Sequence, residues 1–290
     1  MGAKVSSPLW DPCPFKHYTP QTLLSEIKKI QTESATISGN RKLRIVICAS
    51  GKDGKSSSIN NILAALSDNY RQVANCGGQS VHVTQKYQEF DMYITKQSDS
   101  PYVICDTPGL RPYESEERQM VQTEAIKAAI TGKFVDGDMM NFDELKLEDL
   151  KQMKEKQEMA VCVIFVIDSS PLEMKSLEGH DFRCMESVLA FVQQHGIKTA
   201  CLLSKCDLLD TNVKDNLMTI YYSKRVERAR HKVEEEFNFP GDRIFPIVNY
   251  INLLETTPNM RIQTLFPLMH IMSDVLSSFN RRGKVPTNNQ

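Results

Sequence analysis

A glycine, lysine and serine cluster in one short stretch has the residue types and spacing to hold a phosphate group. The stretch runs Ala49-Ser50-Gly51-Lys52-Asp53-Gly54-Lys55-Ser56 and follows an apolar segment at residues 43–48. It matches the pattern G-x-x-x-x-G-K-S, with Ala49 in the place of the first glycine. Main-chain N–H groups of such a loop, and of the helix that follows it, point at phosphate oxygens. The stretch therefore predicts a phosphate-binding loop between a strand and a helix.

Each residue of this loop has an expected role. Lys55 neutralises the β and γ oxygens of a nucleotide and is also a candidate catalytic residue, while Ser56 is a candidate ligand of Mg²⁺. The alternative is an ordinary glycine-rich turn with a solvated lysine, which the strand before it and the helix after it disfavour. The expected nucleotide contacts here are Gly51, Lys52, Asp53, Gly54, Lys55, Ser56 and Ser57.

A second candidate site follows the apolar run at residues 102–105. It reads Asp106-Thr107-Pro108-Gly109. A carboxylate at a strand end beside the phosphate-binding loop can hold a water bound to Mg²⁺, and the Gly109 N–H can donate to a γ-phosphate. Taken alone, this stretch is more typical of a turn. After a phosphate-binding loop in the same sheet, it favours a segment that responds to the nucleotide, with Asp106 as a metal-site residue and Gly109 as a catalytic one.

A third motif, Ser204-Lys205-Cys206-Asp207, follows the apolar run at residues 199–203 and selects the base. It matches N-K-x-D with serine at the first position. The Asp207 carboxylate can accept two hydrogen bonds from guanine, a pairing that adenine cannot make. Lys205 is expected to lie along the base plane. Because Ser204 is shorter than asparagine, its reach back to the phosphate-binding loop stays open, and a plain surface loop is the alternative.

One catalytic part of such a site is missing. Leu110 stands where a glutamine would orient the attacking water, so we expect hydrolysis to be slow. His82, Arg111 and Lys52 are alternatives for placing the water or stabilising charge, in one chain or across a dimer. The simpler interpretation of all three as solvated loop residues is favoured.

The three motifs, in this order, resemble the P-loop GTPase superfamily over residues 43–249. More narrowly, five segments are similar to the interferon-induced protein 44 family: 106–110, 132–134, 161–168, 202–207 and 248–250. The resemblance implies a threonine that coordinates Mg²⁺ and assists catalysis before the second strand. Thr84 is the candidate and Ser80 the second choice. It also implies a base contact at Asn249 and a role in innate immune or antiviral response.

Short β-branched runs alternate with helical patterns along the chain, which predicts the elements that must position these motifs. Strands are expected at residues 43–49, 90–95, 102–105, 161–167, 199–203 and 243–248, and helices at 22–30, 55–66, 117–130, 179–194, 214–237 and 262–279. This alternation favours an α/β fold, a three-layer P-loop NTPase domain with a mostly parallel central sheet and helices on both faces. Phosphate-binding turns then lie at the carboxyl ends of the strands.

The expected domain organisation has three parts. Residues 1–41 form an irregular segment plus a helix, 42–280 the P-loop domain, and 281–290 a disordered tail. Within the domain, residues 133–158 carry charges of both signs and no strand pattern, which indicates a partly helical insertion.

The composition of the chain bears on whether it binds nucleic acid or a membrane. Lysine plus arginine number 35 against 36 acidic residues, so there is no overall basic field and nucleic acid is not an expected partner. No apolar run reaches the roughly 20 residues of a membrane span. The eight cysteines are scattered, which is typical of free buried thiols in a cytoplasmic protein. Membrane contact is not expected unless Gly2, within a loose acylation pattern, is myristoylated.

Three hypotheses follow for function. The leading one is a protein that binds GTP or GDP with Mg²⁺, hydrolyses GTP slowly, and acts as a switch toward an unknown protein effector. A nucleotide-dependent homodimer belongs to this hypothesis as an open alternative. The second is a scaffold or interaction module that binds GTP or GDP without turnover. The third is an ATP-using P-loop enzyme in which residues 204–207 are coincidental.

Overall fold

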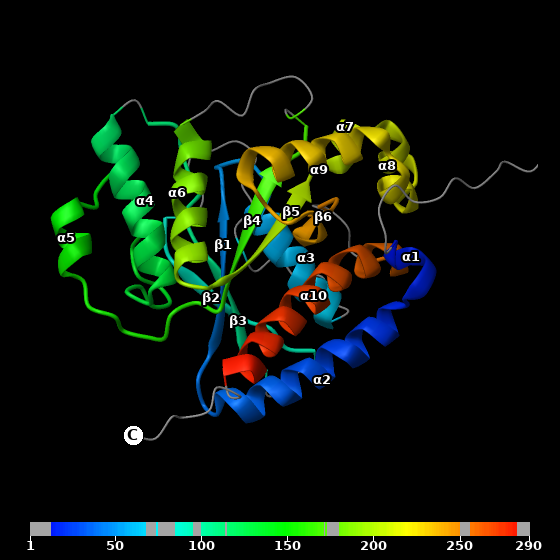
Figure 1. The fold of residues 1–290 in the computed structure, drawn as a ribbon, viewed down its shortest axis with the longest axis horizontal. Helices are drawn as coiled ribbons and strands as arrows, with labels where there is room; N and C mark the ends of the chain where they lie inside the picture. Colours follow the sequence, from blue (N-terminus) through cyan, green and yellow to red (C-terminus); the bar gives the residue numbers. More distant parts are fainter. Residues whose placement is uncertain are drawn as a thin grey trace, which may run out of the picture.

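The computed structural model describes residues 13–67, 74, 85–94, 100–113, 115–170, 172, 180–249 and 256–282. Within them the chain forms a six-stranded sheet in the order β2-β3-β1-β4-β5-β6, shown in Figure 1. The strands are β1 Leu43–Ala49, β2 Gln88–Asp91, β3 Tyr102–Asp106, β4 Cys162–Asp168, β5 Lys198–Ser204 and β6 Ile244–Pro246. All neighbouring strands are parallel except β2, which runs antiparallel to β3 at the edge.

Helices cover both faces of this sheet (Figure 1). The longer ones are α2 Pro20–Ser38, α3 Lys55–Ser67, α4 Glu116–Ile130, α6 His180–Gln194, α9 Lys224–Phe237 and α10 Pro258–Arg282. The short ones are α1 Pro14–His17, α5 Leu147–Gln152, α7 Cys206–Leu209 and α8 Thr211–Asp215, with the 3-10 turns η1 Leu217–Tyr222 and η2 Gly241–Arg243.

The alternation of side chains along β1 divides the core in two. Ile45, Ile47 and Ala49 pack with apolar residues of α2, α3 and α10 on one face. Val46 and Cys48 pack with residues of α4, α6 and α9 on the other. Because successive side chains of a strand point to opposite faces, a strand apolar at every position must be covered on both sides. The predicted three-layer α/β fold is confirmed.

One predicted helix is wrong in its extent. Residues 214–237 form α8, η1 and α9 rather than one helix. The breaks fall at two polar residues that serve as N-caps: Asn216 accepts from the main-chain N–H of Met218 at 3.1 Å, and Ser223 accepts from Val226 at 3.2 Å. Asn and Ser compete with helix interiors by forming such bonds.

Two other boundaries differ from the prediction. The helix expected at 22–30 is α2, which begins after Thr19 with a reciprocal capping box to Thr22 and continues to Ser38. The strand expected at 90–95 is β2, which ends at Asp91; position 95 lies outside the described residues. The lead-in expected to be irregular contains the short helix α1, whose residue Pro14 is buried.

Seven cysteines lie in the described part of the chain, and all are buried free thiols. No helix in that part is both long and apolar enough to span a bilayer.

Candidate functional site

The phosphate-binding loop lies where β1 ends and α3 begins. Gly54 has φ +90°, and a Cβ there would lie 2.7 Å from Nδ2 of Asn249, so both the backbone and the packing require glycine. No described residue accepts a hydrogen bond from the main-chain N–H of Gly54, Lys55 or Ser56. These N–H groups open the α3 helix, where an anion is favoured by unpaired donors and by the helix dipole.

Lys55 and Asp106 form a buried ion pair beside this loop. The Lys55 side chain is 6% exposed and donates from Nζ to Oδ1 of Asp106, which is fully buried at the end of β3. The Ser56 hydroxyl donates to the other oxygen, Oδ2, at 3.4 Å. Two residues that different motifs selected, Lys55 at the start of α3 and Asp106 at the end of β3, are therefore in direct contact.

These oxygens fit a hard divalent cation. Mg²⁺ prefers oxygen ligands and typically takes only one or two from the protein, the rest from phosphate and water. The Ser56 hydroxyl and Asp106 carboxylate supply such a pair. In the described residues there is no cluster of three or more His, Cys, Asp or Glu side chains that would form a self-contained metal site. The donor set therefore matches a cation shared with a phosphate ligand.

The segment after β3 is joined directly to the phosphate-binding loop. The Leu110 N–H donates to Ala49 O at 2.8 Å, and the Gly51 N–H donates to Leu110 O at 2.9 Å. Thr107 donates from its hydroxyl to Ile47 O at 2.8 Å. A Cβ on Gly109 would lie 2.7 Å from the Cα of Gly51, so a glycine is needed for the two loops to touch.

The side chains of the two residues after Gly109, Leu110 and Arg111, make their contacts away from the phosphate-binding loop and the Lys55–Asp106 pair. Leu110 is 1% exposed and packs in the core with residues of α4. The Arg111 guanidinium donates to Oδ2 of Asp143 at 2.7 Å, in the charged insertion. Lys52 is exposed within the loop. Thr84, Ser80 and His82 lie outside the described residues.

The base-selecting motif is tied to the phosphate-binding loop by its serine. The Ser204 hydroxyl donates to Asp53 O at 2.6 Å and to Ile167 O at 3.2 Å. Although serine is shorter than asparagine, its hydroxyl reaches the phosphate-binding loop, because Ser204 ends β5 directly beside that loop. Asp207 lies in the first turn of α7, half-buried, and no described residue donates a hydrogen bond to its carboxylate.

Lys205 is held by a residue that the motifs did not select. It has left-handed φ 58° and donates from Nζ to Oδ2 of Asp168 at 2.5 Å. The other oxygen of Asp168 accepts from the N–H and hydroxyl of Ser170 at 2.9 and 2.7 Å. Asp168 pairs with Ser204 at the end of β4. In the sequence, the one indication of a role for Asp168 is that this charged residue ends an otherwise apolar strand. Burial raises the pKa of the neighbouring Cys206 thiol to about 12, so this residue is a neutral packing group.

Asn249 contacts the phosphate-binding loop. Its Nδ2 donates to Gly54 O at 3.1 Å, and its Oδ1 accepts from Asn61 of α3 at 3.1 Å. Ser58 hydrogen-bonds the same side chain. The structure thus brings together 11 positions that the sequence selected: Gly51, Lys52, Asp53, Gly54, Lys55, Ser56, Ser57, Asp106, Gly109, Ser204 and Asn249, with Lys205 and Asp207 on the adjoining turn.

Comparison with known proteins agrees with this geometry. Residues 44–181 match the family model described as 50S ribosome-binding GTPase. Interferon-induced protein 44 of Mus musculus is 22% identical over 238 residues, covering 80% of this chain and 54% of that protein. Its counterpart in Homo sapiens is 21% identical over 256 residues, covering 87% of this chain and 56% of that protein. The chain thus spans about half the length of the curated relatives it matches.

Solved structures with related backbones include Toc33 from Arabidopsis thaliana in complex with Mg²⁺ and GMPPNP, 14% identical, with a TM-score of 0.49 over 91% of this chain and 96% of that one. A probable GTP-binding protein engB is 16% identical, with a TM-score of 0.42 over 81% of this chain and 99% of that one. The family match over residues 44–181 and the curated relatives, together with the three motifs gathered at the carboxyl ends of β1, β3 and β5, show that the chain resembles P-loop GTPases and, more narrowly, interferon-induced protein 44.

Proposed function

We propose that the chain binds GTP and GDP with Mg²⁺ through Lys55, Ser56, Asp106 and Asp207, and hydrolyses GTP slowly. The observation that carries this proposal is the 2.6 Å hydrogen bond from Ser204 to Asp53 O. It joins the motif that selects guanine to the loop that holds phosphate. One ligand that carries both a base and a phosphate chain explains why the two motifs are fastened together.

The residues divide the work of binding. The N–H groups of Gly54, Lys55 and Ser56, which no described residue accepts from, hold the phosphates together with the Lys55 ammonium, while Asp207 accepts from the guanine base. Asp168 and Asn249 hold Lys205 and Gly54 in place. Ser56 and Asp106 are the residues that would hold Mg²⁺. When bound, Mg²⁺ supplies positive charge against the phosphate oxygens.

Slow turnover is expected from the residues beside Gly109. A glutamine that orients water contributes much of the rate in related phosphoryl-transfer sites. Leu110 is buried here and has no polar atom, and Arg111 is paired with Asp143. The same two observations favour a second candidate function, a scaffold that binds GTP or GDP without turning it over.

Two measurements test the proposal. Mass spectrometry of the nucleotide that co-purifies with the chain should find GTP or GDP; ATP or ADP instead would support the ATP-using alternative. Single-turnover release of phosphate from bound GTP should exceed the uncatalysed background. Release at background, at every protein concentration, would establish the scaffold function, and a rate that rises with protein concentration would show catalysis across a homodimer.

The wider role is proposed from the relatives. We propose that Thr84 joins the Mg²⁺ site when GTP is bound, and that the chain is a cytoplasmic switch acting on a protein effector in innate immune response. Similarity to interferon-induced protein 44 supports this, at 22% identity and about half that protein's length. Induction of the chain by interferon, and a partner retained with a GTP analogue but not with GDP, are the expected results.

A further inference from the structure

The charged insertion contacts both segments that would respond to the nucleotide. We name residues 85–89, which follow the Thr84 candidate, the first segment, and residues 106–113 the second segment. Residues 136–143 of the insertion, which we name the bridging segment, lie between them. These three segments come from distant parts of the sequence, and their contacts are the basis of the inference.

The bridging segment pairs with the first segment through an antiparallel bridge. The Tyr87 N–H donates to Asp138 O, the Gly137 N–H to Tyr87 O, and the Met140 N–H to Gln85 O, each at 2.9 Å. Lys86 and Met139 form an antiparallel bridge. The Asp136 carboxylate also accepts from the Glu89 N–H at 2.9 Å. Main-chain bonds of this kind fix the two segments in register.

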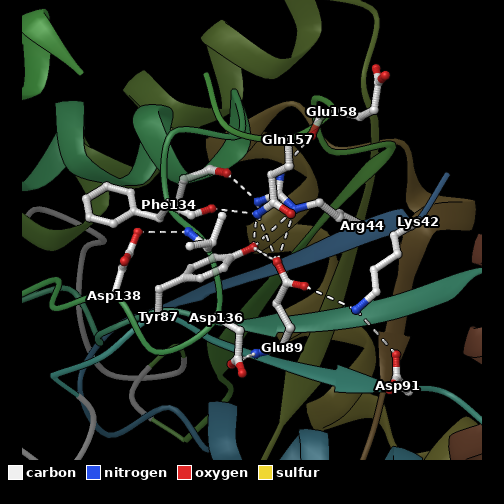
Figure 2. A network of polar contacts seen from close by, with 12 residues as sticks. Lys42, Arg44, Tyr87, Glu89, Asp91, Phe134, Asp136, Asp138, Gln157 and Glu158 are labelled. Carbon is white, nitrogen blue, oxygen red and sulfur yellow. Dashed lines mark hydrogen bonds and ion pairs between the residues drawn. The ribbon is translucent and has the colours of Figure 1, made fainter. Parts of the chain in front are cut away.

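A buried polar network fastens the same junction to β1 (Figure 2). Arg44, 1% exposed, donates to the Tyr87 hydroxyl at 2.5 Å and to Glu158 O at 2.7 Å. Gln157 donates to Glu89 at 2.8 Å and to Phe134 O at 2.5 Å. Figure 2 shows these side chains converging from β1, β2 and both ends of the insertion. A buried network of this kind rigidifies the groups that it joins, so it ties the first segment to the insertion.

The other end of the bridging segment binds the second segment. Asp143 accepts from Arg111 at 2.7 Å and from the Tyr113 hydroxyl at 2.8 Å. The chain turns over residues 141–145, where the main-chain oxygen of Asn141 accepts from Glu144 and Leu145. Met140 and Phe142 are fully buried in the same core cluster as Leu110. Only Asn141 and Phe142 separate Met140, which bonds to the first segment, from Asp143, which bonds to the second, so the link between the two is short.

We infer that the bridging segment couples the first segment to the second, so that a displacement at either is transmitted to the other and to the whole insertion. The trigger rests on the proposed function, because a γ-phosphate would act on Thr84, next to the first segment, and on Gly109, in the second. The coupling itself is a property of the chain. By linkage, it must act equally in both directions.

Hydrogen exchange of the full chain, read by mass spectrometry, tests the coupling without nucleotide. Asp143→Asn removes the ion pair with Arg111 and keeps the size of the side chain. We expect amide exchange at residues 85–89 to accelerate at least about threefold. Arg111→Gln should give the same result. In the other direction, Asp136→Ala removes the acceptor of the Glu89 N–H and should accelerate exchange of the Arg111 and Tyr113 amides.

The matched control is Glu148→Gln, which removes the same charge from the exposed face of α5 in the same insertion. It should leave exchange in both segments unchanged, and exchange in β4 and β5 should be unchanged in every variant. Acceleration confined to the residues next to each substitution would overturn the coupling.

A second arm adds the nucleotide. In the wild-type chain, exchange at residues 136–143 should differ between GDP and a non-hydrolysable GTP analogue, and Asp143→Asn should reduce that difference. Equal exchange in the two complexes would refute transmission to the insertion. A chain that binds neither nucleotide would instead refute the proposed function, while the exchange of the nucleotide-free variants still decides the coupling.

Discussion

At the scale of single residues, Lys55 has two tasks that the sequence motif does not separate. It faces the expected phosphates and it also neutralises the fully buried Asp106. Removing one partner of a buried ion pair leaves an uncompensated charge, which typically destabilises a protein by about 3–5 kcal/mol. Loss of binding in a Lys55 variant is therefore informative only when the folded fraction is measured at the same time.

We expect Lys55→Ala to abolish binding of a fluorescent GDP analogue and also to lower the free energy of unfolding. Lys52→Ala, in the same loop, removes an exposed lysine and keeps the main-chain N–H, so its affinity should stay within about threefold of wild type. Fluorescence titration and urea denaturation of both variants provide the comparison. Retained binding in folded Lys55→Ala would contradict the site itself.

Asp207 decides between guanine and adenine. Asp207→Asn replaces one acceptor oxygen by an amide that donates, so one of the two hydrogen bonds to guanine becomes a contact between two donors; at about 1.5–3 kcal/mol for a bond to a charged group, GDP affinity should fall at least about 10-fold. Competition by ATP should be unchanged. Asp215→Asn, an exposed aspartate on α8, is the control. An unaltered preference for GTP over ATP in Asp207→Asn would show that this turn does not read the base.

At the scale of the elements, the site depends on two turns that touch through glycine. A Cβ on Gly109 would lie 2.7 Å from the Gly51 Cα, whereas a Cβ on Gly51 meets only Leu110 O at 3.5 Å. Gly109→Ala should therefore lower the free energy of unfolding by about 1–3 kcal/mol. Gly51→Ala should stay within about 0.5 kcal/mol of wild type. Urea denaturation measures both, and equal effects would mean that the contact between the turns is not tight in solution.

The polar network around Arg44 holds β1 to the first segment and the insertion. Arg44→Met removes the buried guanidinium that donates to Ala129 O and Glu158 O and pairs with the Glu89 carboxylate, so we expect a loss of about 3–5 kcal/mol in the free energy of unfolding.

Lys42→Met is the matched control, because Lys42 pairs with Glu89 and Asp91 only at 3.7 Å and is 57% exposed. Its cost should be below about 1 kcal/mol. Similar losses in Arg44→Met and Lys42→Met would show that burial of the Arg44 network contributes little.

The strands and most helices were predictable because their apolar periods are strong. β1 was predicted to the residue, since every one of its side chains is buried. The break between α8 and α9 was not, because Asn216 and Ser223 fit a helical pattern until their side chains are seen to cap main-chain N–H groups. Asp168 was missed as a site residue, because its role depends on the parallel pairing that brings β4 beside β5.

The insertion shows the limit of periodicity. Its charges predicted a partly helical insertion and no particular contacts, yet Met140 and Phe142 are fully buried, and its polar residues bond to segments distant in the sequence. Only the three-dimensional structure reveals such pairings, since no regular spacing encodes them.

At the scale of the whole molecule, pH affects stability through His270 on α10. Burial against Phe266 and Phe245, and then the charge of Arg243, hold the pKa of His270 below its ordinary value of 6.5. The unfolded chain therefore binds the proton more readily, so the free energy of unfolding falls as the pH is lowered through about 6.5.

In His270→Gln, the fall in the free energy of unfolding between about pH 7 and pH 5 should be smaller than in wild type. The exposed His195→Gln is the control and should keep the wild-type slope. Urea denaturation at a series of pH values measures it. A slope unchanged by His270→Gln would assign the pH dependence to other groups.

The buried thiols described in the fold give the molecule a set of internal reporters. Burial raises the pKa of the Cys105 thiol to about 11 and that of Cys206 to about 12, and it raises the pKa of Cys48 as well. A protonated, inaccessible thiol reacts with an alkylating reagent only after its surroundings open. Cys48 and Cys105 lie on β1 and β3 just before the two phosphate-facing turns, and Cys206 lies in the base-selecting turn. Their separate labelling rates would therefore record how often each part of the nucleotide site opens, with no probe added to the chain.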